Sequence, residues 1–156
     1  MAAGHDARWH ALYTACRPPL YRAAALLVGE SEAEEVVQDA FEKAMREPDF
    51  FEKVREPVAW LRTVATRTAL GRLRRRALLD RAQRFFGRQD HQTGPGRSVD
   101  LQTALGRLPP KQRAAVILRY YHDAPYAEIA AALEVDAESV GPLLTRARAA
   151  LRDVLR

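Results

Sequence analysis

Arginine dominates one stretch of this 156-residue sequence. Residues 57–88 contain nine arginines and one aspartate, whereas a solvated helix surface usually mixes charges of both signs. Guanidinium groups bind phosphate oxygens, so this stretch predicts contact with a polyanion, and nucleic acid is the first candidate. Residues 1–56 have the opposite balance, with 7 basic and 11 acidic residues. The net charge of +5 therefore conceals an acidic segment followed by a strongly basic one.

Other chemistry is not indicated by the residue types or their spacing. The sequence has no pairing of a nucleophile with a base, no phosphate-cradling glycine loop and no metal-ligand spacing. The single cysteine, Cys16, excludes an intramolecular disulfide, and we interpret it as a small buried side chain. No apolar run approaches the roughly 20 residues that cross a bilayer, and the N-terminus lacks a signal-peptide core. We therefore expect a cytoplasmic protein that is not an enzyme, has no metal or cofactor and does not insert into a membrane.

The elements that position these charges are predicted to be helices, because apolar residues recur at intervals of three and four. A first helix is expected over residues 6–28, with a break or a new start at Pro18 and Pro19. In the next helix, SEAEEVVQDAFEKAMR, Ser31 and Glu34 predict a capping box. Its apolar residues form one stripe, which comprises Ala33, Val36, Val37, Ala40, Phe41 and Ala44.

The rest of the chain predicts an all-α fold of two small helical domains. Pro57 suits the first turn of a third helix, which carries the arginines and extends toward Phe86. Residues 87–100 combine glycine, proline and polar residues without periodicity, so we predict a flexible linker between a domain at 1–86 and another at 101–156. In the second domain, YAEIAAAL and the segment after Asp136 are joined by a short EVD turn, which indicates a helix-turn-helix.

Three motifs in this order resemble the bacterial sigma factors of the extracytoplasmic-function group, which keep only the domains called sigma-two and sigma-four. AEEVVQDAFEKA is similar to the acidic helix that docks on the clamp coiled coil of RNA polymerase. WLRTVATRTALGRLRRR resembles the helix that reads and helps to open the minus-ten promoter element. The stretch from ALGRLPPKQRAAVILRYY through YAEIAAALEV to TRARAALR is similar to the domain that binds the minus-35 element.

The resemblance implies a sigma factor that directs promoter-specific transcription initiation by binding core RNA polymerase and promoter DNA. The polymerase contacts that it implies are Glu34, Glu35, Gln38, Asp39 and Glu42. The DNA contacts that it implies are Arg62, Thr66, Arg67, Arg72, Arg74, Arg75, Arg76, Ser139, Thr145, Arg146 and Arg148. The resemblance also implies an anti-sigma partner. The acidic and basic segments further suggest the hypothesis that a free chain closes its two domains on each other.

The first domain departs from the family pattern in and before its arginine-rich helix. This chain has Arg67 and Gly71 where the family usually has an asparagine and an aspartate, so the promoter sequence does not carry over. The family associates a base-holding pocket with the loop before this helix. Here that loop contains Phe50 and Phe51, which either stack on an unpaired base or cap the helical core.

The helix-turn-helix departs further. Glu134 stands at the turn where the family favours glycine, and a left-handed conformation there costs about 1 kcal/mol. Gly141, Pro142 and Leu143 replace a polar or basic trio, and Pro142 predicts a kink or a delayed helix start. Leu144 is expected in the core, whereas Leu143 suits the core and an apolar seam equally well. An alternative is therefore a sigma-like regulatory or interaction protein with impaired minus-35 recognition.

Overall fold

The computed structural model describes residues 2–86 and 100–155. The elements in those ranges are α1 (Ala2–Val28), α2 (Glu30–Arg46), α3 (Phe50–Lys53), α4 (Pro57–Phe86), α5 (Leu101–Gly106), α6 (Pro110–Val116), the π-helical turn η1 (Ile117–Tyr121), α7 (Tyr126–Leu133) and α8 (Ala137–Leu155). The prediction of an all-α fold is confirmed. The predicted linker lies outside the described residues except for Asp100. None of the described helices is both long enough and apolar enough to span a membrane.

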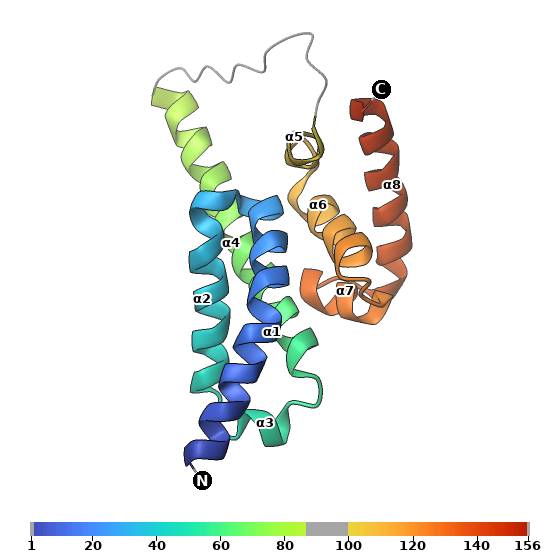
Figure 1. Cartoon of the computed structure of the whole chain (residues 1–156). Coiled ribbons are helices and arrows are strands. Elements are labelled where there is room, and N and C mark those ends of the chain that lie inside the picture. Colours follow the sequence, from blue (N-terminus) through green and yellow to red (C-terminus); the bar gives the residue numbers. More distant parts are fainter. Residues whose placement is uncertain (1, 87–99, 156) are drawn as a thin grey trace.

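The N-terminal unit is a bundle in which α1, α2 and α4 lie side by side, with α3 at one end (Figure 1). All six apolar residues of the stripe predicted for α2 are buried in this bundle. Leu61 and Leu70 of α4 and Leu20 of α1 are buried with them. Helix α4 begins at Pro57 and ends at Phe86, as the sequence predicts. The 3.6-residue periodicity thus identifies correctly which face of α2 packs against α1 and α4.

Helix α1 runs unbroken through Pro18 and Pro19, so the predicted break is wrong. Each proline lacks an N–H and therefore leaves the carbonyl four residues earlier without its helical partner. Those carbonyls belong to Thr14 and Ala15, which are exposed, so water can hydrogen-bond to them. The buried neighbours Cys16 and Leu20 pack in the core of the bundle. Packing on that side outweighs the cost of two prolines on the solvent side.

A single residue, Gly29, joins α1 to α2, and the predicted capping box is wrong. Gly29 has φ 93°, a conformation that residues with a Cβ rarely adopt, and its N–H donates to the carbonyl of Ala25. Helix α2 therefore begins at Glu30, one residue before the expected cap Ser31, and no side chain caps it. Glu34 forms an ion pair with Arg17 instead.

The C-terminal unit consists of α5 to α8, and its core includes Leu105, Leu118, Ile129, Leu133 and Val140. Asp100 caps α5 by accepting a hydrogen bond from the N–H of Thr103 at 2.8 Å, which lowers the pKa of Asp100.

The turn between α7 and α8 contains the left-handed residue expected from the sequence. Glu134 has φ 56° and ψ 48°, and the N–H of Val135 donates to the carbonyl of Ala130. This hydrogen bond satisfies a carbonyl at the end of α7, as in other left-handed helix ends. The helix-turn-helix therefore forms without the glycine that usually allows this conformation.

Helix α8 begins at Ala137 and continues through Pro142, so the expected delayed start is wrong. The carbonyl that Pro142 deprives of a partner belongs to Glu138, which is exposed and can bind water. The side chain of Leu144 is completely buried, as expected, and Leu143 is half-buried against the same core. Packing of the inner face again outweighs a proline on the outer face.

We expect the left-handed conformation of Glu134 to lower the free energy of unfolding by a measurable amount. The change Glu134→Gly should raise the free energy of unfolding by up to about 1 kcal/mol, because glycine adopts positive φ without a Cβ clash. Glu138→Gly is the matched control, and it should lower the stability by about 1 kcal/mol because Glu138 lies within the helix. Urea unfolding followed by circular dichroism measures both. Equal effects of the two variants would contradict the assignment.

Candidate nucleic-acid and polymerase interfaces

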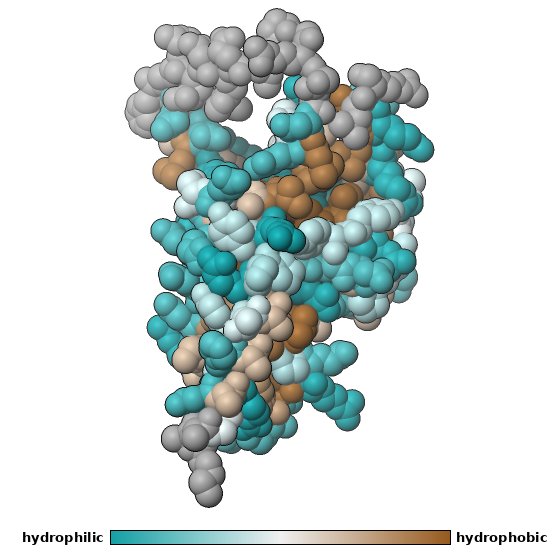
Figure 2. Space-filling view, viewed as in Figure 1, coloured by the Kyte–Doolittle hydropathy of each residue, from teal (hydrophilic) through white to brown (hydrophobic). Residues whose placement is uncertain are grey.

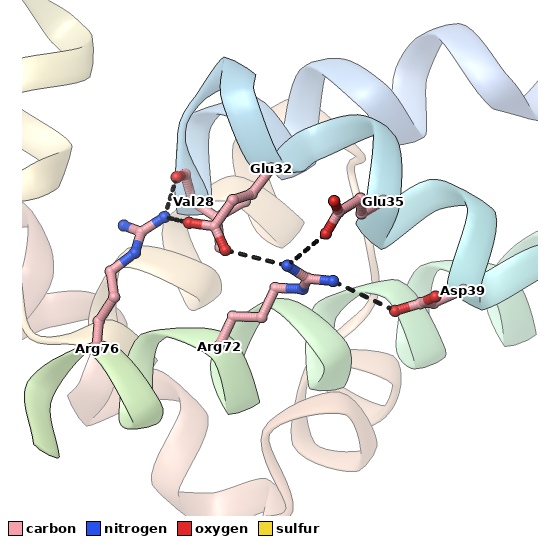
Figure 3. Close-up of polar contacts among 6 residues, drawn as sticks. All are labelled: Val28, Glu32, Glu35, Asp39, Arg72 and Arg76. Carbon is pink, nitrogen blue, oxygen red and sulfur yellow. Dashed lines mark hydrogen bonds and ion pairs between the residues drawn. The ribbon is translucent and has the colours of Figure 1, made fainter. Parts of the chain in front are cut away.

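Two arginines of the basic helix are bound to carboxylates of α2 (Figure 3). Arg72 lies 3.1 Å from Glu32, 2.9 Å from Glu35 and 3.5 Å from Asp39, and its side chain is only 16% exposed. Arg76 pairs with Glu32 and also donates to the carbonyl of Val28. These two predicted DNA contacts thus neutralise the acidic helix within the same unit.

The predicted polymerase contacts are divided between paired and available side chains. Glu35 and Asp39 share Arg72, and Glu34 lies 2.5 Å from Arg17. The negative charge of Glu34 raises the pKa of Arg17. Gln38 and Glu42 are both exposed on the same helix. Their surface continues into a recess of about 460 Å³ between α1 and α2, whose apolar lining includes Trp9, Tyr13, Phe41 and Met45.

Tyr13 and Met45 were not predicted from the sequence, and both contribute exposed apolar surface beside Gln38 and Glu42. The signal for Met45 was present, because it lies four residues after Phe41 and outside the stripe that ends at Ala44. Tyr13 comes from another helix, so no local pattern places it beside α2.

Three further predicted DNA contacts lie against the C-terminal unit. The Nε of Arg62 lies 3.1 Å from the Oε2 of Glu128. The Nη1 of Arg62 donates to the carbonyl of His122 at 3.2 Å. Arg67 donates to the carbonyl of Ala131 at 2.5 Å. Thr66, between them, is buried. The structure therefore places the N-terminal half of α4 on α7, where Arg62 and Thr66 are largely withdrawn from solvent and Arg67 stays partly exposed.

Burial shifts the pKa of two side chains at this contact between the units. Burial raises the pKa of Glu128, an effect that the nearby positive charge of Arg62 only partly offsets. Burial also lowers the pKa of His122 to about 4, and Arg62 adds to the decrease. Although Arg62 and Glu128 are close, the Nε and Oε2 atoms are not aligned as a hydrogen bond. The pair therefore compensates its desolvation incompletely and contributes little net stability to the contact.

A further arginine crosses between the units in the other direction. Arg113 of α6 donates to the carbonyl of Leu27, at the end of α1, at 2.8 Å. It also donates to the carbonyls of Gly106 and Leu108 at 3.0 and 3.1 Å. Burial lowers the pKa of Arg113, and the positive charge of Arg76 adds to this.

The remaining predicted DNA contacts are exposed. Arg74 and Arg75 lie on α4 between the two paired arginines. On α8 the exposed candidates are Ser139, Thr145, Arg146 and Arg148. The hydroxyl of Thr145 donates to the carbonyl of Gly141, and Arg148 donates to the hydroxyl of Tyr120 at 2.5 Å. The structure thus gathers the predicted contacts into separate groups and not into one surface.

Phe50 and Phe51 belong to an aromatic cluster and not to an open base-stacking surface. Phe50 is buried between Trp9 and Trp60, with ring centroids 5.1 Å from each. Phe51 packs edge-on against Trp9 at 4.7 Å. Of the two alternatives predicted from the sequence, stacking on an unpaired base and capping of the helical core, the second describes the positions of Phe50 and Phe51.

The same loop nevertheless borders a recess of about 630 Å³ between the start of α4 and α7. Lys53, Arg55, Trp60 and Thr63 contribute to it from the N-terminal unit, and Glu128 from the C-terminal unit. Neither Lys53 nor Arg55 was predicted as a contact from the sequence, although both are basic and precede the arginine-rich helix.

A second kind of surface is almost entirely apolar. A groove of about 340 Å³ runs between α1 and the C-terminal unit, and its lining includes Leu26, Leu105, Ile117, Tyr120 and Leu151. Figure 2 shows hydrophobic side chains gathered over α5 and between α5 and α8. By contrast, the described residues contain no group of three or more side chains that could hold a metal ion.

Comparisons with known proteins agree with this geometry. The family description "Sigma-70 region 2" matches residues 12–78, and "Sigma-70, region 4" matches residues 98–151. The RNA polymerase sigma factor SigV of Bacillus subtilis is 30% identical over 132 residues, which cover 79% of this chain and 74% of that protein. The chain belongs to the sigma-70 family. It is an RNA polymerase sigma factor of the extracytoplasmic-function group, and this finding favours the main interpretation of the sequence over the alternative of a regulatory protein.

Other sigma factors extend the similarity to nearly the whole chain. The ECF sigma factor SigE of Mycolicibacterium smegmatis is 32% identical over 165 residues, covering 94% of this chain and 61% of that protein. Among solved structures, the sigma factor RpoE bound to the anti-sigma factor NepR, from Bartonella quintana, gives a TM-score of 0.74 at 26% identity. That match covers 95% of this chain and 96% of RpoE. CnrH bound to the cytosolic domain of CnrY gives a TM-score of 0.71 at 26% identity, over 99% of this chain and 91% of CnrH.

The structure predicts that Arg72 contributes more to stability than its neighbours do. The change Arg72→Met should lower the free energy of unfolding by roughly 1–3 kcal/mol, because it leaves Glu35 and Asp39 without their cation and Glu32 with Arg76 alone. Arg75→Met removes an exposed arginine three residues away and should change stability by less than about 0.5 kcal/mol. Urea unfolding of both variants tests this, and similar losses would contradict the structural role of Arg72.

The half-buried imidazole of His122 predicts a specific loss of stability in acid. The pKa of His122 falls from 6.5 to about 4 in the folded chain, so between those values only the unfolded chain gains a proton. Stability is therefore retained above pH 6.5 and declines as the pH falls toward 4. The change His122→Asn should flatten the decline in melting temperature between pH 6.5 and 4, whereas His10→Asn, at an exposed position, should retain it. A wild-type decline in the His122 variant would contradict this account.

Proposed function

We propose that this sigma factor engages promoter DNA mainly through Arg74 and Arg75 of α4, with Arg72 and Arg76 serving to hold α4 on α2. The observation that supports this division is the carboxylate cluster around Arg72 and Arg76. Arg72 is shared by three carboxylates and has little remaining charge to offer a phosphate, and Arg76 is held by Glu32 and the carbonyl of Val28. Exposed arginines on the same helix retain that capacity.

We propose that core RNA polymerase contacts α2 through Gln38 and Glu42 and the apolar recess beside them. The two polar side chains are exposed, and Met45 and Tyr13 add apolar surface at the same place. Protein interfaces commonly combine an apolar centre with a polar rim, and charge complementarity sets the orientation of the partners. Glu35 and Asp39 support this surface indirectly, because their pairing with Arg72 fixes α2 against α4.

The closed arrangement has to open for Arg62 and Arg67 to reach DNA, since both now bind the C-terminal unit. The closure has a different basis from the attraction between acidic and basic segments that the sequence suggested. Most of that attraction is used inside the N-terminal unit, between α2 and α4. The two units that we propose, 1–86 and 101–156, meet through Arg62, Arg67 and Arg113, which bind backbone carbonyls across the contact, and through the pairs of Arg62 with Glu128 and of Arg67 with Glu134.

Opening also makes the recess before α4 accessible. Lys53, Arg55 and Trp60 line it from the N-terminal unit, and Glu128 narrows it from the other side. We propose that an unpaired base of the minus-ten element occupies this space once α7 has moved. An aromatic side chain with flanking cations is suited to an unstacked base and its phosphate.

The minus-35 contact that we propose for α8 is mainly to phosphates. The exposed positions in the first turns of the helix carry Ala137, Glu138, Ser139 and Pro142, whereas its exposed cations, Arg146, Arg148 and Arg152, come later. Base edges are usually read by the N-terminal residues of such a helix. The sigma factor should therefore depend strongly on the minus-ten region and weakly on the sequence at minus-35.

We propose that an anti-sigma protein covers the apolar groove lined by Leu26, Leu105 and Leu151. RpoE and CnrH, which share this fold, are bound to NepR and CnrY respectively. The groove has almost no polar lining, so an apolar face of a partner helix suits it. A partner there would touch both units at once and keep them closed. We further propose that the chain acts in the cytoplasm, beside the polymerase, and catalyses no reaction itself.

Transcription with purified components tests the proposal. The chain plus core polymerase should initiate specifically on genomic DNA, and failure to bind core or to initiate would overturn it. The double change Arg74→Gln and Arg75→Gln should lower promoter affinity and reduce the slope of log affinity against log salt by nearly 2, because each phosphate contact contributes about 0.9. Arg22→Gln, at an exposed position of α1, is the charge-matched control for one substitution and should leave the slope unchanged. An unaltered slope in the double variant would contradict the assigned contacts.

A further inference from the structure

A third recess lies where α4 meets the C-terminal unit, and it is lined mainly by charged side chains. Its volume is about 310 Å³. Arg67 and Arg74 line it from α4, Lys111 from α6 and Glu134 from the turn after α7. The apolar side chains of Leu70 and Leu133 complete the lining. Residues distant in the sequence therefore bring three cations and one carboxylate to a common cavity.

The positive charge in this recess is only partly compensated. Arg67 lies 3.9 Å from Glu134, whose side chain is 71% exposed, so the pair contributes little. Among the described residues no ion pair involves Arg74 or Lys111. Both differ in this respect from Arg62, Arg72 and Arg76. Three cations against one carboxylate leave an excess of two positive charges around the cavity.

Gly71 leaves the positive charge of Arg74 uncompensated, because it has no side chain that could form an ion pair with Arg74. A Cβ at position 71 would lie 3.8 Å from the Nη2 atom of Arg74. An acidic side chain there would reach the guanidinium and neutralise it. The helix therefore presents Arg74 to the recess with no carboxylate from its own preceding turn.

We propose that this recess binds a phosphate-bearing anion held by Arg67, Arg74 and Lys111. Guanidinium groups bind phosphate oxygens in pairs, and an ammonium group adds a compact point charge. The phosphate comes either from a free polyphosphate or nucleotide, or from a nucleic-acid backbone. Because the ligands belong to both units, a bound anion stabilises the closed arrangement and keeps Arg67 on α7. The site shares Arg74, and Arg67 after opening, with the promoter contacts proposed above, whereas Lys111 belongs to this recess alone.

Binding of inorganic triphosphate to the full-length chain tests the proposal. Calorimetric titration at constant ionic strength should show saturable binding and a rise in melting temperature. Arg74→Gln and Lys111→Gln should each weaken binding about tenfold, because each removes a charge-assisted hydrogen bond. Gly71→Asp should weaken it as well, by supplying a carboxylate to Arg74. Arg81→Gln, at an exposed position of α4 outside the recess, is the control and should bind as the wild type does.

The two sources of phosphate are separated by a parallel titration with a duplex oligonucleotide. Lys111 is the deciding position, since it lies on α6 and outside the helix proposed to contact the minus-ten region. A free anion as ligand predicts that Lys111→Gln weakens triphosphate binding and leaves transcription by the polymerase complex unchanged. A backbone phosphate as ligand predicts that the same change weakens duplex binding by the isolated chain. The proposal is overturned if neither probe binds, or if the Arg74 and Lys111 variants bind both probes as tightly as the control does.

Discussion

The ion cluster between α2 and α4 is the interaction on which the rest of the arrangement depends. Arg72 is largely buried and is shared by three carboxylates, so it cannot turn away without leaving several charges unpaired. Successive residues of an α-helix are rotated by about 100°. Fixing Arg72 and Arg76 toward α2 therefore fixes the direction of every other side chain on α4. Arg74 and Arg75 then point elsewhere, and the N-terminal half of the helix presents Arg62 and Arg67 to α7.

One residue type consequently serves three purposes along a single helix. Some arginines hold the bundle together, some hold the second unit, and some remain exposed. The partner decides which purpose each serves: a set of carboxylates for Arg72, a buried carboxylate and a carbonyl for Arg62, and solvent for Arg75. The net positive charge of residues 57–88 predicts an affinity for anions in general. How that charge is distributed between the chain itself and DNA depends on packing between distant elements.

Local patterns in the sequence predict the helices well and their partners poorly. The stripe of α2, the start of α4 at Pro57 and the burial of Leu144 follow from periodicity and proline chemistry. The continuity of α1 through Pro18 does not, because it depends on packing of the opposite face. The pairing of carboxylates with arginines is also invisible in the sequence, since Glu32 and Arg72 are forty residues apart. Both kinds of error have the same origin, which is that tertiary contacts outweigh local preferences of about 1–3 kcal/mol.

The π-helical turn η1 has a consequence for how this protein tolerates changes in length. The N–H of His122 donates to the carbonyl of Ile117, five residues earlier, so the turn accommodates one residue more than an α-helix would. Deleting one residue from η1 would restore α geometry and rotate the preceding helix α6 by about 100° relative to α7. Because α6 packs on α8, that rotation would disturb the seat of the helix-turn-helix as well as the rim of the apolar groove. Insertions and deletions in this short segment therefore change the angle between α6 and the helix-turn-helix.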